Sequence, residues 1–168
     1  MTELPNGDVT FLFTDLEGST ALWDRYPDVM PQALAVHDVR IRDIVDTHDG
    51  YVFTTAGDSF AVAFSSAQSA VMTAFEIQRS MSEPAEDLDL KVRIGVHSGT
   101  AQLRDGDYFG GAVNRAARVE GCAHGRQIVL SQPTVEQLGS RLPDGSELLA
   151  LGTHRLRGLV EPERIYQL

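Results

Sequence analysis

The chain has 168 residues and a formal net charge of −10, with 42% apolar and 23% charged residues. This length and composition predict one globular domain, residues 1–168, with enough apolar residues for a substantial core. The acidic charge argues against nonspecific nucleic-acid binding, because a negative field repels phosphate backbones. We find no apolar stretch near the roughly 20 residues that a membrane span needs, so we expect no membrane contact by this chain.

Cysteine content and the first residues bear on the compartment. Cys122 is the only cysteine, so no internal disulfide can form, which suits a reducing cytoplasm. The start of the chain, Met1–Pro5, has no basic region followed by an apolar run, and we expect no signal peptide. These features predict a cytoplasmic protein.

Apolar periodicity and turn residues predict the secondary structure. In chain order, the first expected elements are a strand over 9–13, a helix over 19–23 capped by Ser19, a helix over 30–47, a strand pair over 51–53 and 60–64, and a helix over 67–81. They are followed by a strand over 90–96, a tight loop over 106–111, a helix over 112–119, a strand over 128–130, a helix over 133–138, and strands over 148–156 and 164–168. This order predicts an α+β fold, a ferredoxin-like (split βαβ) sandwich with a C-terminal strand and helix extension.

Two aspartates follow predicted strands and lie in glycine-bearing turns. Asp15 lies in the segment FTDLEGST, and Asp58 lies in the segment GDSFAVAF. Taken singly, Asp15 could cap the helix that follows and Asp58 could merely occupy a hairpin turn. The order of elements, however, places their strands side by side. Magnesium prefers one or two protein carboxylates and substrate phosphates, and two such ions can activate an attacking oxygen and stabilise a leaving one. The pair therefore predicts metal-dependent chemistry on a nucleotide.

A second set of polar residues lies in the segment GDYFGGAVNRAAR. Gly110 and Gly111 leave backbone N–H groups open near a helix N-terminus, where the helix dipole favours anions. Asn114 and Arg118 are four residues apart and project from one face, as an amide and a planar cation suited to phosphate. The alternative is a small-residue helix packed on the sheet with two solvated polar groups. The residues alone leave both interpretations open.

The segments FTDLEGST, GDSFAVAF, RIGVHSG and GDYFGGAVNRAAR, in this order and spacing, resemble those of class III nucleotidyl cyclase catalytic domains. The likeness extends from Val9 to Tyr166 and is strongest to small actinobacterial-type adenylate cyclase-like domains. It implies a single cyclase homology domain that converts ATP to 3′,5′-cyclic AMP and pyrophosphate.

The resemblance also implies residue roles. Asp15 and Asp58 match the two metal-binding aspartates, and the backbone carbonyl of Leu16 would add a ligand, for two Mg²⁺ or Mn²⁺ ions per active site. Asn114 matches the asparagine that orients the ribose, and Arg118 matches the arginine that stabilises the α-phosphate during the reaction.

Further residues match the base and triphosphate contacts. Asp107 matches the acid that reads the adenine edge, and Thr54 stands where the adenylate cyclases usually carry a purine-contacting lysine. Threonine is shorter and neutral, so we expect relaxed base discrimination, with ATP preferred and GTP also possible. Arg157 falls near the family's basic triphosphate contact, with Arg155 as a rival.

The family's domains work as head-to-tail pairs with active sites at the interface. The resemblance therefore implies a homodimer with two composite sites and an inactive monomer. One alternative is a catalytically weak or inactive cyclase-like module that binds a nucleotide and regulates a partner. Another is a different two-metal nucleotide transferase whose product is a linear ester. The retained metal and transition-state residues favour the enzyme.

Overall fold

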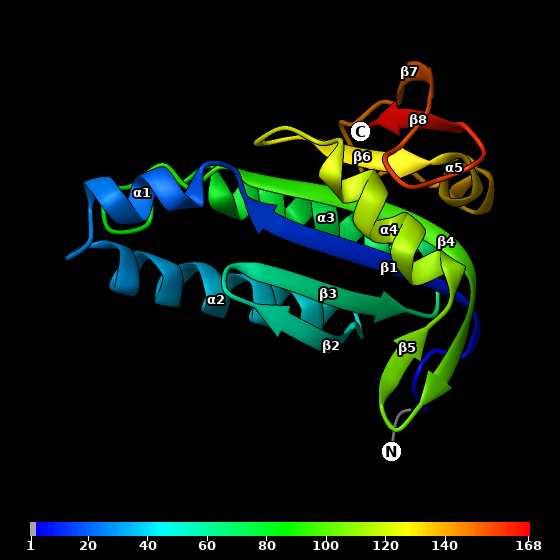
Figure 1. The fold of residues 1–168 in the computed structure, drawn as a ribbon, viewed down its shortest axis with the longest axis horizontal. Coiled ribbons are helices and arrows are strands. Elements are labelled where there is room, and N and C mark those ends of the chain that lie inside the picture. Colours follow the sequence, from blue (N-terminus) through cyan, green and yellow to red (C-terminus); the bar gives the residue numbers. More distant parts are fainter. Residues whose placement is uncertain (1–2) are drawn as a thin grey trace.

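A mixed β-sheet forms the centre of the computed structural model, which describes residues 3–168. The first elements are β1 (Gly7–Leu16), α1 (Ser19–Arg25), α2 (Met30–Thr47), β2 (Tyr51–Ala56), β3 (Ser59–Phe64) and α3 (Ala67–Met81) (Figure 1). The later elements are β4 (Val92–Arg104), β5 (Asp107–Phe109), α4 (Gly111–Gly121), β6 (Ile128–Ser131), α5 (Gln132–Leu138), β7 (Leu149–His154) and β8 (Glu163–Gln167). Within this part of the chain we find no helix with the length and hydropathy to cross a membrane.

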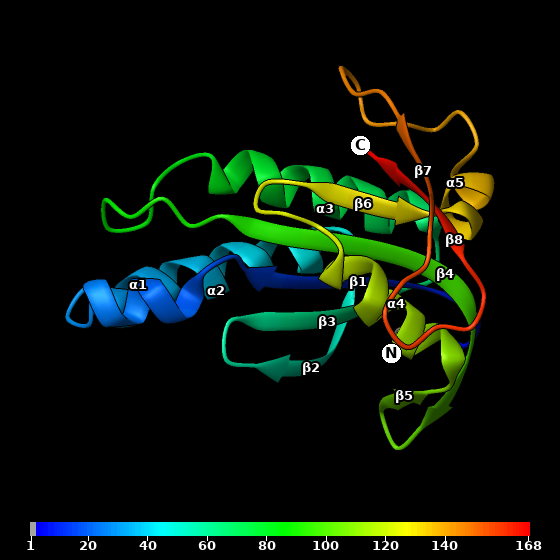
Figure 2. The same cartoon turned by 45° about the horizontal axis from the view of Figure 1, so that its top comes forward.

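The strand order is β2-β3-β1-β4-β6-β8-β7, with β5 paired to β4 beside this path. β1 pairs antiparallel with both β3 and β4, and β2 pairs antiparallel with β3. Helix α2 joins β1 to β2 and helix α3 joins β3 to β4, which is the predicted split βαβ core. Beyond it, β6 lies parallel to β4, and β8 and β7 extend the sheet at the end far from α1 (Figure 2).

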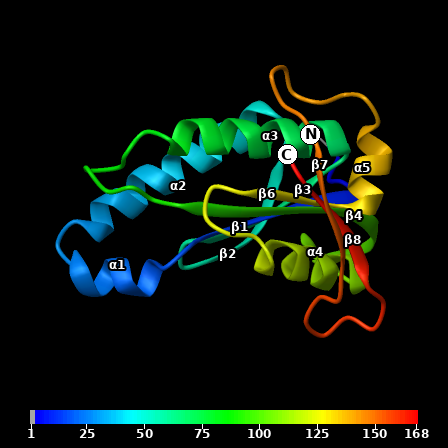
Figure 3. The same ribbon diagram turned by 90° about the horizontal axis from the view of Figure 1, so that it is seen from above.

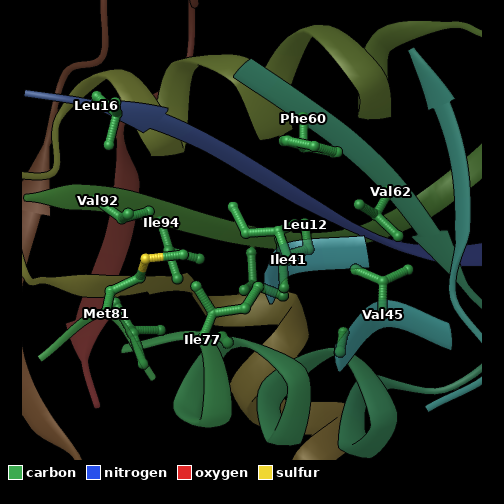
Figure 4. Packing of buried hydrophobic residues seen from close by; sticks show 14 of the residues in the cluster. Leu12, Leu16, Ile41, Val45, Phe60, Val62, Ile77, Met81, Val92 and Ile94 are labelled. Atoms are coloured by element: carbon green, nitrogen blue, oxygen red, sulfur yellow. The ribbon is translucent and has the colours of Figure 1, made fainter. Parts of the chain in front are cut away.

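Helices α2 and α3 cover one face of the sheet, and α4 lies on the opposite face (Figure 3). Successive strand residues point to opposite faces, so Leu12 and Leu16 of β1 meet the covered side. They belong to one buried cluster with Ile41 and Val45 of α2 and Ile77 of α3 (Figure 4). This packing explains why α2 and α3 form where apolar residues recur at helical spacing.

The α4 face of the sheet carries a second apolar cluster. The rings of Phe11, Phe53 and Tyr108 pack edge to face, with centroids between 5.0 and 5.8 Å apart. Gly95 of β4 lets α4 approach the sheet closely, because a Cβ on this glycine would lie only 2.3 Å from the backbone nitrogen of Glu120. The strand therefore fixes the C-terminal half of α4 in place.

Two sequence predictions for the middle of the chain were wrong. The strand expected over 90–96 continues to Arg104, because its polar second half pairs with β1 and then with β5. The loop expected over 106–111 contains the short strand β5, which the apolar pattern did not reveal because it has only three residues.

The predicted cap of α1 was also wrong. Ser19 is the first helical residue, and the capping position belongs to Gly18, which has φ 68° and makes no side-chain cap hydrogen bond. The tight turn after β1 requires this left-handed backbone, which glycine adopts at low cost.

Candidate active site

The two predicted acids meet at one end of β1. Asp15 lies near the end of that strand, and Asp58 lies in the turn between the neighbouring β2 and β3. The backbone N–H of Leu16 donates a hydrogen bond to Asp58 Oδ1 at 3.2 Å. Antiparallel pairing of β1 with β3 brings the β2–β3 turn to this end of β1, so the structure joins acids that are 43 positions apart in the sequence.

An arginine that the sequence analysis did not single out pairs with the first acid. Arg93 of β4 stands directly opposite Asp15 in the β1–β4 register. Its Nε donates to Asp15 Oδ1 at 2.6 Å and a terminal nitrogen donates to Oδ2 at 2.5 Å. Such two-point pairs are stronger and more directional than single hydrogen bonds. The ion pair therefore holds the Asp15 carboxylate in one orientation.

Glu120 of α4 is the third acid at this place, and it was also missed. Its Oε1 lies 3.7 Å from Arg93 Nε, its side chain is 13% exposed, and that oxygen is buried without a hydrogen-bond partner. Burial raises the pKa of Glu120 from 4.5 to about 8, and the Asp15 and Asp58 carboxylates add to the rise while Arg93 opposes it. The only sequence signal was a carboxyl two residues beyond Arg118 on the same helix.

The acids supply hard oxygen donors of the kind that Mg²⁺ and Mn²⁺ prefer. Among residues 3–168, no group of three or more His, Cys, Asp or Glu side chains is arranged to hold a metal. Magnesium is commonly bound through one or two carboxylates with substrate phosphates and water completing its shell. Asp15, Asp58 and the Leu16 carbonyl fit that donor set, provided that Asp15 is released from Arg93.

Basic residues gather on the other side of α4. Arg118, Arg155 and Arg157 line one hollow of about 330 Å³, together with Cys122. The guanidinium of Arg118 lies beside Gly158, since a Cβ there would be 3.6 Å from its Nε. Both rival tail arginines therefore share a hollow with the predicted transition-state arginine. Three cations around one hollow favour a bound anion such as a polyphosphate.

Helix geometry separates the acids from the basic hollow. Each residue of an α-helix is rotated by about 100° from the last, so Arg118 and Glu120 point about 200° apart. Asn114 and Arg118 share one side of α4, and both are exposed. Glu120 faces the acids instead. One chain thus presents the acids around Asp15 and the pair of Asn114 and Arg118 on different sides of the helix.

The two predicted base contacts lie on strands that do not pair with each other, since β2 pairs with β3 and β5 pairs with β4. Thr54 of β2 is exposed and lines a hollow of about 190 Å³ with Phe13 and Glu120. Asp107 of β5 is half-buried, and its Oδ1 accepts a hydrogen bond from the Tyr108 N–H at 2.8 Å. The structure shows no hydrogen bond between Thr54 and Asp107 in the described chain.

A more voluminous hollow, about 650 Å³, lies away from these residues. Glu3, Asp46 and Asp49 are among its lining residues, and three carboxylates disfavour a phosphate. Its lining therefore suits a phosphate less well than the basic hollow does.

The family model for the adenylate and guanylate cyclase catalytic domain matches residues 1–168. The chain belongs to this family. The match confirms the class III cyclase resemblance that the four sequence segments indicated.

Curated relatives of this cyclase domain include bacterial and trypanosomal proteins. An uncharacterized protein of Mycobacterium tuberculosis is 42% identical over 166 residues, which cover 98% of this chain and 56% of that protein. The receptor-type adenylate cyclase GRESAG 4.3 of Trypanosoma brucei brucei is 34% identical and matches 98% of this chain but 17% of its own length. The cyclase domain therefore spans about half of the mycobacterial relative and a small part of the trypanosomal one.

Solved structures have the same architecture. Adenylate cyclases from Trypanosoma brucei, solved in their monomeric state, include one with a TM-score of 0.90 and 30% identity, covering 99% of this chain and 91% of that one. The adenylate/guanylate cyclase/hydrolase from Silicibacter pomeroyi has a TM-score of 0.82 and 28% identity, with 95% of each chain covered. These structures confirm the α+β fold of the class III cyclase type.

Proposed function

We propose that this cyclase domain converts ATP to 3′,5′-cyclic AMP and pyrophosphate, with Mg²⁺ or Mn²⁺, in a head-to-tail homodimer with two composite active sites. The similarity to receptor-type adenylate cyclases supports ATP as the substrate. The oxygen donors of Asp15, Asp58 and Leu16 support the metal requirement, and the basic hollow beside α4 supports a triphosphate ligand.

The proposal of a dimer rests on one observation, which is that α4 separates the acids from Arg118 within one chain. Arg118 points toward the tail hollow, while Glu120 points toward Asp15 and Arg93. A substrate held at the acids of one chain therefore lies on the wrong side of the helix for that chain's own Arg118. A second copy in head-to-tail orientation supplies Arg118 from its own α4, and symmetry completes a second site.

Each subunit then contributes a different set of residues to one active site. Asp15 and Asp58 hold the divalent ions, which when bound activate the ribose 3′-hydroxyl and neutralise charge on the phosphates. Asn114 of the partner subunit hydrogen-bonds the ribose and so directs its 3′-hydroxyl at the α-phosphate. Arg118 of the partner subunit stabilises the negative charge that grows on the α-phosphate oxygens. Arg155 of the partner subunit and Arg157 of the partner subunit line the same hollow as that arginine and balance the charge of the leaving pyrophosphate.

The base contacts differ from those usual in the family's adenylate cyclases at one position, Thr54. Asp107 can accept a hydrogen bond from the adenine amino group, whereas Thr54 offers one short hydroxyl where a lysine would reach further. We therefore propose a preference for ATP with relaxed discrimination against GTP.

The changed purine contact, with Thr54 in place of the usual lysine, also favours a second candidate function, a nucleotide-binding regulatory module with little or no turnover. An assay of cyclic nucleotide and pyrophosphate with ATP or GTP, in Mn²⁺ and at several protein concentrations, separates the two. If the chain is a cyclase, cyclic AMP should form only with the metal, and the specific activity should rise with protein concentration. Nucleotide binding without any cyclic product would select the regulatory module.

A further inference from the structure

The ion pair between Arg93 and Asp15 poses a problem for metal binding. Arg93 takes up both Asp15 oxygens, at 2.6 and 2.5 Å, and the two side chains are only 29% and 20% exposed. A divalent cation needs the same oxygens. A guanidinium held this close would repel a doubly charged ion strongly, because water screens little at such short range. Metal entry therefore requires Arg93 to move.

Glu120 is a ready acceptor for the displaced guanidinium. Its Oε1 is buried without a hydrogen bond and lies 3.7 Å from Arg93 Nε, so a small rotation of the arginine would form a normal hydrogen bond. The backbone of Glu120 is fixed against Gly95, where a Cβ would come within 2.3 Å of its nitrogen. Arg93 and Gly95 are two residues apart on β4 and share one face of the sheet.

We propose that Arg93 exchanges partners as the metal site fills, holding Asp15 in the metal-free chain and moving to Glu120 when a divalent cation occupies Asp15 and Asp58. Arg93 and Glu120 are positioning residues here, and neither contacts the substrate. The exchange gives the Arg93 guanidinium a carboxylate partner in both states, which a site without Glu120 could not do. The inference rests on the metal role proposed for Asp15 and Asp58.

A rival explanation is that Glu120 itself ligates the metal. The two accounts differ in what Glu120 does once Arg93 is gone. If Glu120 only accepts the Arg93 guanidinium, it should not affect metal affinity once Arg93 has been replaced by Gln. As a ligand, it contributes equally in both backgrounds. A double-mutant cycle on metal affinity therefore separates them.

The measurement is the affinity of the full chain for Mn²⁺ without nucleotide. Unbound Mn²⁺ is quantified by its electron paramagnetic resonance signal. We expect Arg93→Gln to bind Mn²⁺ about fivefold more tightly, because a competitor for Asp15 is removed. Glu120→Gln should bind about fivefold more weakly, and this loss should fall below about twofold in the Arg93→Gln background. Arg126→Gln is the matched control, since Arg126 forms a surface ion pair with Asp89 at 2.5 Å. The affinity of this variant for Mn²⁺ should equal that of the native chain.

Equal losses from Glu120→Gln in both backgrounds, or weaker binding by Arg93→Gln, would overturn the exchange. If Asp58→Asn leaves Mn²⁺ affinity unchanged, the metal site itself is wrong and both proposals fail. If Arg93→Gln does not fold, Arg93→Lys keeps the charge but loses the two-point contact and should bind Mn²⁺ more tightly than the native chain. A Mn²⁺-loaded structure reads the exchange directly: Arg93 Nε within hydrogen-bond distance of Glu120 supports it, and an unbroken Arg93–Asp15 pair contradicts it.

Discussion

The backbone N–H of Leu16 donates to Asp58 Oδ1 at 3.2 Å, which fixes the acid of the β2–β3 turn beside the acid of β1. The hydrogen bond takes up one Asp58 oxygen and leaves the other for a ligand. It also ties the turn to the strand that carries Asp15. Two acids in a fixed relation are what a small divalent ion requires, because Mg²⁺ tolerates little distortion of its shell.

Replacing Asp58 by Asn tests this relation. The amide oxygen can still accept from Leu16, so the free energy of unfolding should change little. The lost negative charge should lower cyclic AMP formation by about 100-fold or more, as for other groups that stabilise developing charge. The readouts are turnover at saturating Mn²⁺ and thermal unfolding. Asp89→Asn, at a surface ion pair, is the control and should retain full activity.

Thr54→Lys tests the base contact. A lysine there should add a charged hydrogen bond to the purine edge, worth about 1.5–3 kcal/mol, and should raise the preference for ATP over GTP about tenfold or more. The measurement is kcat/KM for both nucleotides in the native and variant proteins. Thr55→Lys, on the neighbouring exposed residue, is the control. Rates and preference unchanged from the native protein would show that Thr54 does not face the base.

The burial of His97 should make the free energy of unfolding depend on pH. The side chain is 4% exposed and its Nδ1 lies 2.7 Å from Ser131 Oγ. Burial, with the nearby Arg115 charge, lowers the pKa of His97 from 6.5 to about 4. Between these values the unfolded chain binds a proton that the folded chain does not. Stability from this group is therefore complete above pH 6.5 and is lost as pH falls toward about 4, by at most about 3 kcal/mol.

Urea unfolding of the metal-free protein at several pH values measures that loss. His97→Gln should flatten the decline between pH 6.5 and 4, because the titrating group is gone. His124→Gln removes a histidine whose side chain is 81% exposed and should leave the decline intact. An equally steep decline in both variants would assign the pH dependence to other groups.

The sequence predicts the fold well where apolar periodicity is long and regular. Helices α2 and α3 begin and end at the predicted residues, because buried positions such as Ile41 and Ile77 recur at helical spacing. The short β5 and the polar half of β4 were missed. Their pairing depends on strand partners far along the chain, and no local pattern in the residues reports such a partner.

Site residues could likewise be predicted from the sequence only where the local pattern reveals them. Asp15 and Asp58 were predicted because each follows a strand and lies in a glycine turn. Arg93 and Glu120 were missed, because each reads locally as a surface charge on a strand or a helix. Only the β1–β4 register and the close packing of Glu120 on Gly95 bring them to the acids.

The shared active site is the central claim, and mixing two inactive variants tests it most directly. Asp58→Asn damages the metal half of a site, and Arg118→Ala damages the phosphate half, so each variant alone should be inactive. A one-to-one mixture that exchanges subunits should form heterodimers that hold one intact site each, and should recover about a quarter of the native specific activity. A mixture as inactive as its components, in dimers shown to have exchanged subunits, would contradict a site built from two chains.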